Sequence, residues 1–193
     1  MLRALFLAAP GAGKGTQGPG LAERHGVPYI STGDMLRHHV AEGTTLGEAA
    51  RSSMERGELV PDDLVVAMVR DRITSPEPLA GFVLDGFPRT LNQAEAAYEW
   101  GRDRGKTFHA VISLDVPEDE LLRRVRERQQ ASGRADDDVE TFKNRLLVYA
   151  HETEPLIGFY RHRGILLEID GTGEVDEVTD RIDRALARLD LSS

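Results

Sequence analysis

Cysteine is absent from this sequence of 193 residues. The chain can therefore form no disulfide and no zinc site built on cysteine, which fits a reducing compartment. Histidine is scarce as well, and the six histidines lack the spacing of a metal site. His38 and His39, for example, are neighbours on a predicted helix and so point in different directions. We expect no structural zinc and interpret the histidines as structural or exposed.

Positive charge and long hydrophobic runs are also in short supply. The chain carries 33 acidic against 24 basic residues, a net charge of −9, so we expect neither a nucleic acid nor an anionic membrane as a partner. No apolar run approaches the roughly 18 residues that span a membrane, and no signal-peptide pattern is found near the N-terminus. These features predict a cytoplasmic protein in which any anion site is a local cluster of positive side chains.

Apolar runs alternate with helical periods along the chain. Short apolar runs predict strands at 3–8, 28–30, 82–85, 110–115 and 165–170. Periodic segments predict helices at about 14–25, 33–42, 46–56, 62–74, 91–104, 118–130, 139–160 and 175–189. Apolar strands separated by helices indicate an α/β fold, with a parallel sheet covered by helices on both faces. The short polar stretch at 131–138 is predicted to be a mobile surface segment.

A glycine-rich segment follows the first predicted strand. Residues 8–16 read Ala-Ala-Pro-Gly-Ala-Gly-Lys-Gly-Thr, and the backbone N–H groups from Gly11 to Gly15 can converge on phosphate oxygens. Lys14 supplies a point charge for the β- and γ-phosphates, and Thr16 offers a hydroxyl on the Mg²⁺ side. An ordinary glycine-rich turn is the alternative, but the strand–loop–helix context favours a phosphate-binding loop.

Two features of this region depart from expectation. The first glycine of the general phosphate-loop pattern is replaced by Ala8, for which we expect a negative φ because positive φ would strain alanine. Gly18-Pro19-Gly20 falls inside the helix that follows the loop. Proline and glycine both disfavour a helix interior, so either the helix is kinked there or tertiary packing overrides local propensity.

Two further motifs carry candidate functional residues. Ser-Thr-Gly-Asp-Met-Leu-Arg occupies 31–37, and Leu-Asp-Gly-Phe-Pro-Arg-Thr occupies 84–90. Asp85 ends an apolar strand, where a carboxylate beside a phosphate loop can hold Mg²⁺ through water. Arg89 follows at the carboxyl edge of the sheet, where ligands bind in such folds. Asp34 has the alternative interpretation of a helix cap.

The order of these motifs resembles that of the adenylate kinase family, and the resemblance runs nearly end to end. The matching segments lie at 9–17, 30–37, 57–62, 81–90, 133–137 and 144–149. The stretch 128–138 cannot hold the extra strands of a long lid, so the chain is similar to the short-lid form. Ala8, where the family usually has glycine, and Gly18-Pro19-Gly20 are departures from the family pattern.

The resemblance implies reversible transfer of the γ-phosphoryl group of Mg-ATP to AMP, giving two ADP. It implies a three-layer fold with five parallel strands, a monomeric state, and ATP, AMP, ADP and Mg²⁺ as the molecules bound. It also implies three parts: a core of 1–30, 61–128 and 139–193, an AMP-binding insertion at 31–60, and a lid at 129–138.

Site residues follow from the resemblance by matched position. The implied ATP-binding residues are Gly11, Ala12, Gly13, Lys14, Gly15, Thr16, Arg124, Arg128 and Gly173. The implied AMP-binding residues are Thr32, Leu36, Arg37, Met54, Glu58, Leu59, Val60, Val65, Gly86, Phe87, Arg89, Gln93, Arg134 and Arg145. Catalytic roles are implied for Lys14, Arg89, Arg124, Arg128, Arg134 and Arg145. Asp85 and Thr16 are expected to hold Mg²⁺ through water.

Two alternatives stay open. A kinase for UMP or CMP is the nearest, although Thr32 and Gln93 favour adenine, because that branch usually has alanine after the serine at 31. A nucleotide-binding switch without transfer activity is the other. A switch needs neither an acceptor pocket nor a second arginine clamp, and the sequence lacks an Asn-Lys-x-Asp guanine reader.

Overall fold

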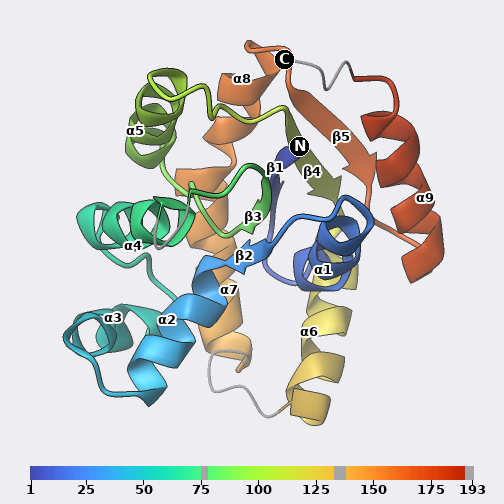
Figure 1. Ribbon diagram of the computed structural model, residues 1–193. Helices are drawn as coiled ribbons and strands as arrows, with labels where there is room; N and C mark the ends of the chain where they lie inside the picture. Colours follow the sequence, from blue (N-terminus) through green and yellow to red (C-terminus); the bar gives the residue numbers. More distant parts are fainter. Residues whose placement is uncertain (75–77, 133–137, 190–193) are drawn as a thin grey trace.

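Five parallel strands form the centre of the fold (Figure 1). The computed structural model describes residues 1–74, 78–132 and 138–189. The strands are β1 (Arg3–Ala8), β2 (Tyr29–Ser31), β3 (Phe82–Asp85), β4 (Ala110–Asp115) and β5 (Leu166–Asp170), in the order β2-β3-β1-β4-β5. The predicted α/β fold with a parallel sheet is confirmed. Parallel pairing places all the carboxyl ends at one edge, where β1 leads into the glycine-rich segment.

Helices connect successive strands. They are α1 (Lys14–Arg24), α2 (Thr32–Ala41), α3 (Thr45–Glu55), α4 (Asp62–Thr74), α5 (Leu91–Arg102), α6 (Glu118–Ser132), α7 (Val139–Val148), α8 (Pro155–Arg161) and α9 (Val175–Leu186). Most boundaries lie within a few residues of the predicted ones. Helix α6 extends to Ser132 and so enters the segment predicted to be a mobile loop, whereas residues 133–137 lie outside the described part of the chain.

The helix predicted at 139–160 is divided by a π-helical turn at Tyr149–Thr153. Pro155 lacks the N–H that would continue the regular ladder, and the N–H of Glu154 donates to the carbonyl of Tyr149, five residues back, at 2.9 Å. Helical periodicity continues through such a turn, which explains why the sequence pattern indicated one helix.

Both faces of the sheet are covered. On β1, Ala4 and Phe6 pack with the cluster that includes buried residues of α1, α6 and α9. Leu5 and Leu7 point to the opposite face and pack with α5 and α8. Because successive side chains of a strand alternate between faces and both faces are covered, this central strand is apolar from Ala4 to Ala8. None of the helices in the described part of the chain is long and apolar enough to span a bilayer.

Helix α1 runs through Pro19 from Lys14 to Arg24. The hydrogen bond that proline removes is the one to the carbonyl of Gly15, in the first turn. Leu21 and Ala22 are buried in the core on the far side of the proline. The helix therefore continues through the proline, and the burial of this part of α1 in the core offsets the unfavourable local propensity.

Candidate functional site

The loop between β1 and α1 presents backbone N–H groups to an open space. Gly11 has φ +84° and Gly13 has φ +103°, a region that residues with a side chain rarely adopt. Gly13 is the N-cap of α1 and provides no side-chain cap. The Thr16 N–H bonds back to the Gly13 carbonyl at 3.0 Å, and the N–H groups of Lys14 and Gly15 precede the first intrahelical acceptor. A Cβ on Gly15 would meet nothing within 4 Å. This arrangement suits an anion, with the helix dipole adding favourable partial charge.

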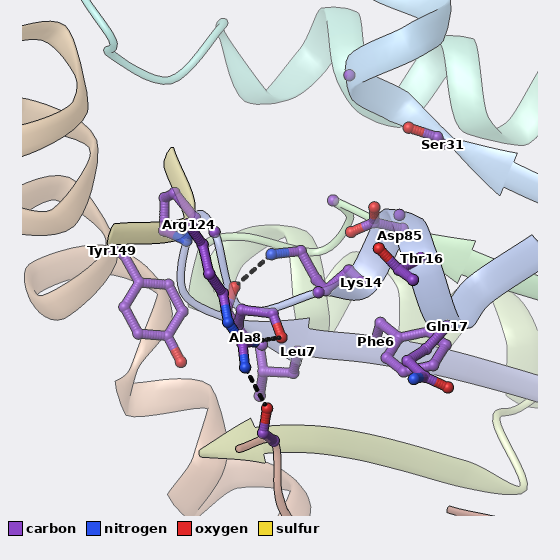
Figure 2. A pocket seen from close by; sticks show the side chains of 18 of the residues that line it. Phe6, Leu7, Ala8, Lys14, Thr16, Gln17, Ser31, Asp85, Arg124 and Tyr149 are labelled. Carbon is purple, nitrogen blue, oxygen red and sulfur yellow. Dashed lines mark hydrogen bonds between the residues drawn. The ribbon is translucent and has the colours of Figure 1, made fainter. Parts of the chain in front are cut away.

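Lys14 folds back over its own loop. Its Nζ donates hydrogen bonds to the carbonyl of Ala8 at 2.7 Å and to that of Ala9 at 2.9 Å (Figure 2). Burial lowers the pKa of Lys14 to about 8, although the Asp85 carboxylate acts in the opposite direction. The ammonium is thus held in place by two carbonyl oxygens of the loop, and the Asp85 carboxylate only partly offsets the effect of burial on its pKa.

Ala8 is the last residue of β1 and is 6% exposed. No non-glycine residue in the described ranges has a positive φ, so the expected negative φ of Ala8 is confirmed. Alanine is therefore unstrained at a position where the general pattern has glycine.

Replacing Ala8 with glycine is expected to destabilise the protein by about 0.4–1 kcal/mol, because glycine raises the conformational entropy of the unfolded chain without relieving strain. Thermal unfolding of the two proteins measures the difference. A higher melting temperature for the glycine variant would show that alanine is strained at this position.

A cavity of about 980 Å³ opens over the loop at the carboxyl edge of the sheet. The basic side chains along its wall are Lys14, Arg37, Arg89, Arg123, Arg124, Arg128 and Arg145. Gly173, in the loop between β5 and α9, also lines it. The protein therefore concentrates positive charge here despite its net charge of −9, as the sequence led us to expect of any anion site.

Arg124 connects three parts of the cavity wall. Its Nη2 donates to the carbonyl of Gly171 at 3.0 Å, and its Nε donates to Glu120 Oε1 at 2.7 Å on the same helix. Its Nη1 approaches the carbonyl of Ala12 at 3.4 Å. Hydrogen bonds from Arg123 and Arg124 lower the pKa of Glu120 to about 2. Arg124 is thus oriented at the wall by backbone and carboxylate acceptors.

A second cavity, of about 60 Å³, lies beside the first among α2, α3 and α4. Its apolar lining consists of Leu36, Met54, Leu59, Val60 and Val65, and its polar lining includes Thr32 and Gln93. Gly86 contributes backbone. Arg37, Arg89 and Arg145 line both cavities. Three guanidinium groups therefore stand where the two spaces meet.

Arg89 is oriented by its surroundings. Its Nε donates to the carbonyl of Gly86 at 2.9 Å, and its backbone N–H donates to Gln93 Oε1 at 2.8 Å. Gln93 Nε2 in turn donates to Asp62 Oδ1 at 2.6 Å. Asp62, the first residue of α4, thereby fixes the amide of a predicted base-contacting residue.

Gly86 allows a close approach next to Arg89. It has φ +82°, and a Cβ there would lie 2.5 Å from Thr32 Oγ1. The hydroxyl of Thr32 donates to the carbonyl of Asp85 at 3.2 Å. The β3 end and the start of α2 can meet only because position 86 has no side chain.

At the start of α2, the alternative interpretation of Asp34 as a cap is not what the structure shows. Ser31 is the N-cap, and its hydroxyl accepts from the Asp34 N–H at 3.2 Å. The Asp34 carboxylate instead accepts from Arg37 Nη2 at 2.6 Å. This ion pair lies at the lining of the large cavity.

Asp85 has one engaged and one unpaired oxygen. The hydroxyl of Tyr29 donates to Oδ2 at 2.9 Å. Oδ1 is buried and has no hydrogen-bond partner among the residues that the structure describes. Asp85 and Thr16 both line the large cavity (Figure 2). An unpaired carboxylate oxygen and a hydroxyl suit the oxygen-rich shell of Mg²⁺, so these residues fit such an ion.

Some predicted residues stand apart. Glu58 is not among the residues lining either cavity, and its carboxylate pairs with Arg56 at 2.7 Å. Phe87 is buried in the apolar cluster beneath the smaller cavity. Arg134 lies outside the described residues. No group of three or more His, Cys, Asp or Glu side chains within residues 1–74, 78–132 and 138–189 could hold a metal.

Comparison with known proteins places this geometry in a family. The family model described as adenylate kinase matches residues 6–165. The chain belongs to the adenylate kinase family. An adenylate kinase from Thermus thermophilus is 49% identical over 182 residues, which cover 94% of this chain and 95% of that protein. Adenylate kinase from Thermobifida fusca is 47% identical over 185 residues, covering 96% and 98%.

The family resemblance inferred from the motifs is thereby confirmed. Adenylate kinases are phosphotransferases that convert ATP and AMP to two ADP, and they use Mg²⁺ with ATP. ATP, AMP and ADP are accordingly the substrates of this family. This reaction requires positioning and charge stabilisation and no protein nucleophile, which suits a site dominated by guanidinium groups and backbone N–H groups.

Proposed function

We propose that the large cavity binds Mg-ATP, that the smaller cavity receives AMP, and that the phosphoryl group crosses between them. The observation that carries this proposal is the shared lining: Arg37, Arg89 and Arg145 belong to both cavities. Phosphoryl transfer brings donor and acceptor phosphates together, and arginines at that meeting point offset the charge of both.

At the donor end, the N–H groups from Gly11 to Gly15 and the first turn of α1 hold the ATP phosphates. Lys14 leaves its two carbonyl acceptors for the β- and γ-phosphates. Arg124 lies against the adenine of ATP, Arg128 binds its phosphates, and Gly173 borders the nucleotide. Gly13 supports this placement, because a Cβ there would lie 3.8 Å from Arg124 Nη1, so the loop and the arginine face each other.

At the acceptor end, Arg37 and Arg89 clamp the AMP phosphate. Thr32, Gly86 and Gln93 contact the adenine, and the apolar lining surrounds it. A space of about 60 Å³ accommodates only part of a nucleotide, so the rest of AMP extends into the large cavity. From the family resemblance we add Glu58 and Phe87 beside the base, and Arg134 and Arg145 over the transferring group.

Asp85 and Thr16 hold Mg²⁺ through water. The bound ion supplies charge neutralisation at the ATP phosphates. The unpaired Oδ1 of Asp85 supports this assignment, because a buried carboxylate oxygen without a donor is costly unless a cation or its water engages it.

The chain divides into a core of 1–30, 61–128 and 139–193, an AMP-binding insertion at 31–60 and a lid at 129–138. Closure of the insertion and the lid over the substrates excludes water that would otherwise hydrolyse ATP. We further propose that the protein is a monomer in the cytoplasm that binds neither nucleic acids nor membranes. Size measurement by light scattering tests the monomeric state.

A panel of acceptors tests the proposed base site. With Mg-ATP as donor, kcat/KM for AMP is expected to exceed that for CMP, UMP and GMP by about 100-fold or more, because buried polar groups matched to one base are left unpaired by another. A coupled assay of ADP formation gives these values. Comparable values for CMP and AMP would support the pyrimidine-nucleotide alternative, and absence of transfer to every acceptor would support a switch.

A further inference from the structure

Tyr29 is a half-buried aromatic residue at the start of β2 whose hydroxyl reaches the neighbouring strand β3. The register pairs Ser31 with Asp85 and Tyr29 with Val83, so Tyr29 lies two residues before the carboxyl end of β2. Its hydroxyl donates to Asp85 Oδ2 at 2.9 Å. Oδ1 has no hydrogen-bond partner in the described part of the chain, so the bond from Tyr29 makes the two carboxylate oxygens of Asp85 different.

The ring of Tyr29 occupies space that an ordinary helical residue in α1 would fill. A Cβ built on Gly18 would lie 2.3 Å from Cε2 of Tyr29 and 2.9 Å from Cδ2 and Cζ. Real Cβ atoms essentially never approach so closely. Gly18 is also buried within α1, where glycine is unfavourable compared with alanine. The glycine therefore has a packing reason, which is the close passage of the Tyr29 ring.

A phenol is protonated at neutral pH, so the Tyr29 hydroxyl is a donor. Burial and the adjacent Asp85 carboxylate raise the pKa of Tyr29 well above its usual value. A protonated phenol offers one hydrogen, and the Asp85 carboxylate accepts it. The hydrogen bond thus holds the Asp85 side chain in one orientation.

We propose that Tyr29 is a positioning residue that orients Asp85 through Oδ2 and leaves Oδ1 for a metal-bound water, and that Gly18 provides the space that its ring requires. This inference rests on the proposed role of Asp85 toward Mg²⁺. It gives a function to Gly18, the first residue of the unexpected Gly-Pro-Gly segment, and it adds Tyr29 to the residues that support phosphoryl transfer.

Binding of a non-hydrolysable ATP analogue with and without metal tests this role separately from turnover. Calorimetry gives one Kd with excess Mg²⁺ and another with EDTA. The Kd with EDTA divided by the Kd with Mg²⁺ is the factor by which the metal strengthens binding. Tyr29→Phe removes the hydroxyl and keeps the ring, and it should lower this ratio about 3- to 10-fold. A merely structural role would change both Kd values alike and would leave the ratio as it is.

A matched control removes a hydroxyl elsewhere. Tyr160 is buried more deeply than Tyr29, and its hydroxyl has no hydrogen-bond partner among the described residues. Tyr160→Phe should leave the ratio at the value of the unmodified protein. Asp85→Asn should lower the ratio at least as far as Tyr29→Phe does, because it alters the carboxylate itself.

The spatial part of the proposal is tested by combining two substitutions. Gly18→Ala should lower the melting temperature by about 4–8 °C, because the new Cβ overlaps the Tyr29 ring. In a background that carries Tyr29→Ser, the ring is gone, and Gly18→Ala should instead raise the melting temperature by about 2–4 °C, because alanine is favoured over glycine in a helix. Equal shifts in both backgrounds would overturn the role given to Gly18.

The outcomes separate this inference from the proposed metal site. If Asp85→Asn lowers the ratio and Tyr29→Phe does not, Tyr29 has no positioning role and the metal assignment survives. If neither variant changes the ratio, the assignment of Asp85 to Mg²⁺ is wrong as well. A lower ratio for both, with an unchanged Tyr160→Phe control, supports the inference.

Discussion

Replacing Lys14 with methionine is expected to lower kcat/KM for ATP by about 100- to 1000-fold. Methionine keeps much of the length of the side chain and removes the ammonium that we propose binds the donor phosphates. The loop fixes that ammonium before substrate arrives, since Nζ is held by the carbonyls of Ala8 and Ala9. In the proposed complex Nζ exchanges these carbonyls for the β- and γ-phosphates, where charge develops in the transition state, so the loss of the ammonium lowers the rate of the reaction itself.

The same substitution should not lower the stability of the free protein at pH 7. Burial lowers the pKa of Lys14 to about 8 from its ordinary value of 10.5, so the unfolded chain binds more protons than the folded one between these two values. Stability therefore rises with pH across this window, and the charged lysine disfavours the folded state below pH 8. Melting curves of the methionine variant should lack this rise and should lie no lower than those of the unmodified protein at pH 7.

Lys143→Met is the matched control, because Lys143 is exposed and pairs only loosely with Glu140 at 3.4 Å. It should leave both activity and the pH dependence of melting as they are. If Lys14→Met keeps more than about a tenth of the activity, the lysine does not contact the transferring phosphates.

Replacing Arg89 with lysine is expected to lower kcat/KM for AMP by about 30- to 1000-fold while the fold is kept, which corresponds to about 2–4 kcal/mol. The Arg89 guanidinium can donate from Nε to the carbonyl of Gly86 and still present its two Nη groups to a phosphate. An ammonium group cannot do both, since it offers one point charge and no fixed fork. Steady-state rates at varied AMP measure the loss.

Arg24→Lys serves as the control, because Arg24 pairs with Asp183 at 3.0 Å on the exposed side of α1. This variant should retain the rate and the melting temperature. An unchanged rate in a folded Arg89→Lys protein would show that Arg89 lies outside the phosphate clamp.

The sequence predicted the fold because its strongest signals are local. The apolar residues of β1 point alternately to the two faces of the sheet, and both faces are buried. Gly11 and Gly13 then mark the turn into α1, where both have positive φ. The shared order of motifs then brought Thr32, Arg89 and Gln93 to one place. The structure places these three along the smaller cavity.

Contacts between distant segments could not be predicted in this way. The hydrogen bonds from Gln93 to Asp62 and from Tyr29 to Asp85 join residues 31 and 56 positions apart. Nothing in periodicity or spacing specifies such pairs. A glycine within a helix, as at Gly18, is the signal that could have directed attention to a close neighbour, but the identity of that neighbour depends on the packing of α1 against β2.

The π-helical turn was missed for a related reason. Pro155 in a predicted helix indicates a break, yet the chain resolves it with one hydrogen bond from Glu154 to Tyr149 and continues helically. Hydrophobic periodicity is nearly unchanged by one extra residue. Tyr149 and Thr153, which belong to this turn, both line the large cavity, so the turn shapes part of its wall.

Nucleotide stoichiometry in a closed reaction tests the transfer between the two cavities most directly. Purified protein is incubated with ATP and Mg²⁺, with and without AMP, and the nucleotides and free phosphate are quantified. We predict two ADP for each ATP consumed, no release of phosphate, and negligible consumption of ATP without AMP. One ADP and one phosphate for each ATP, at the same rate without AMP, would contradict direct transfer to an acceptor in the smaller cavity.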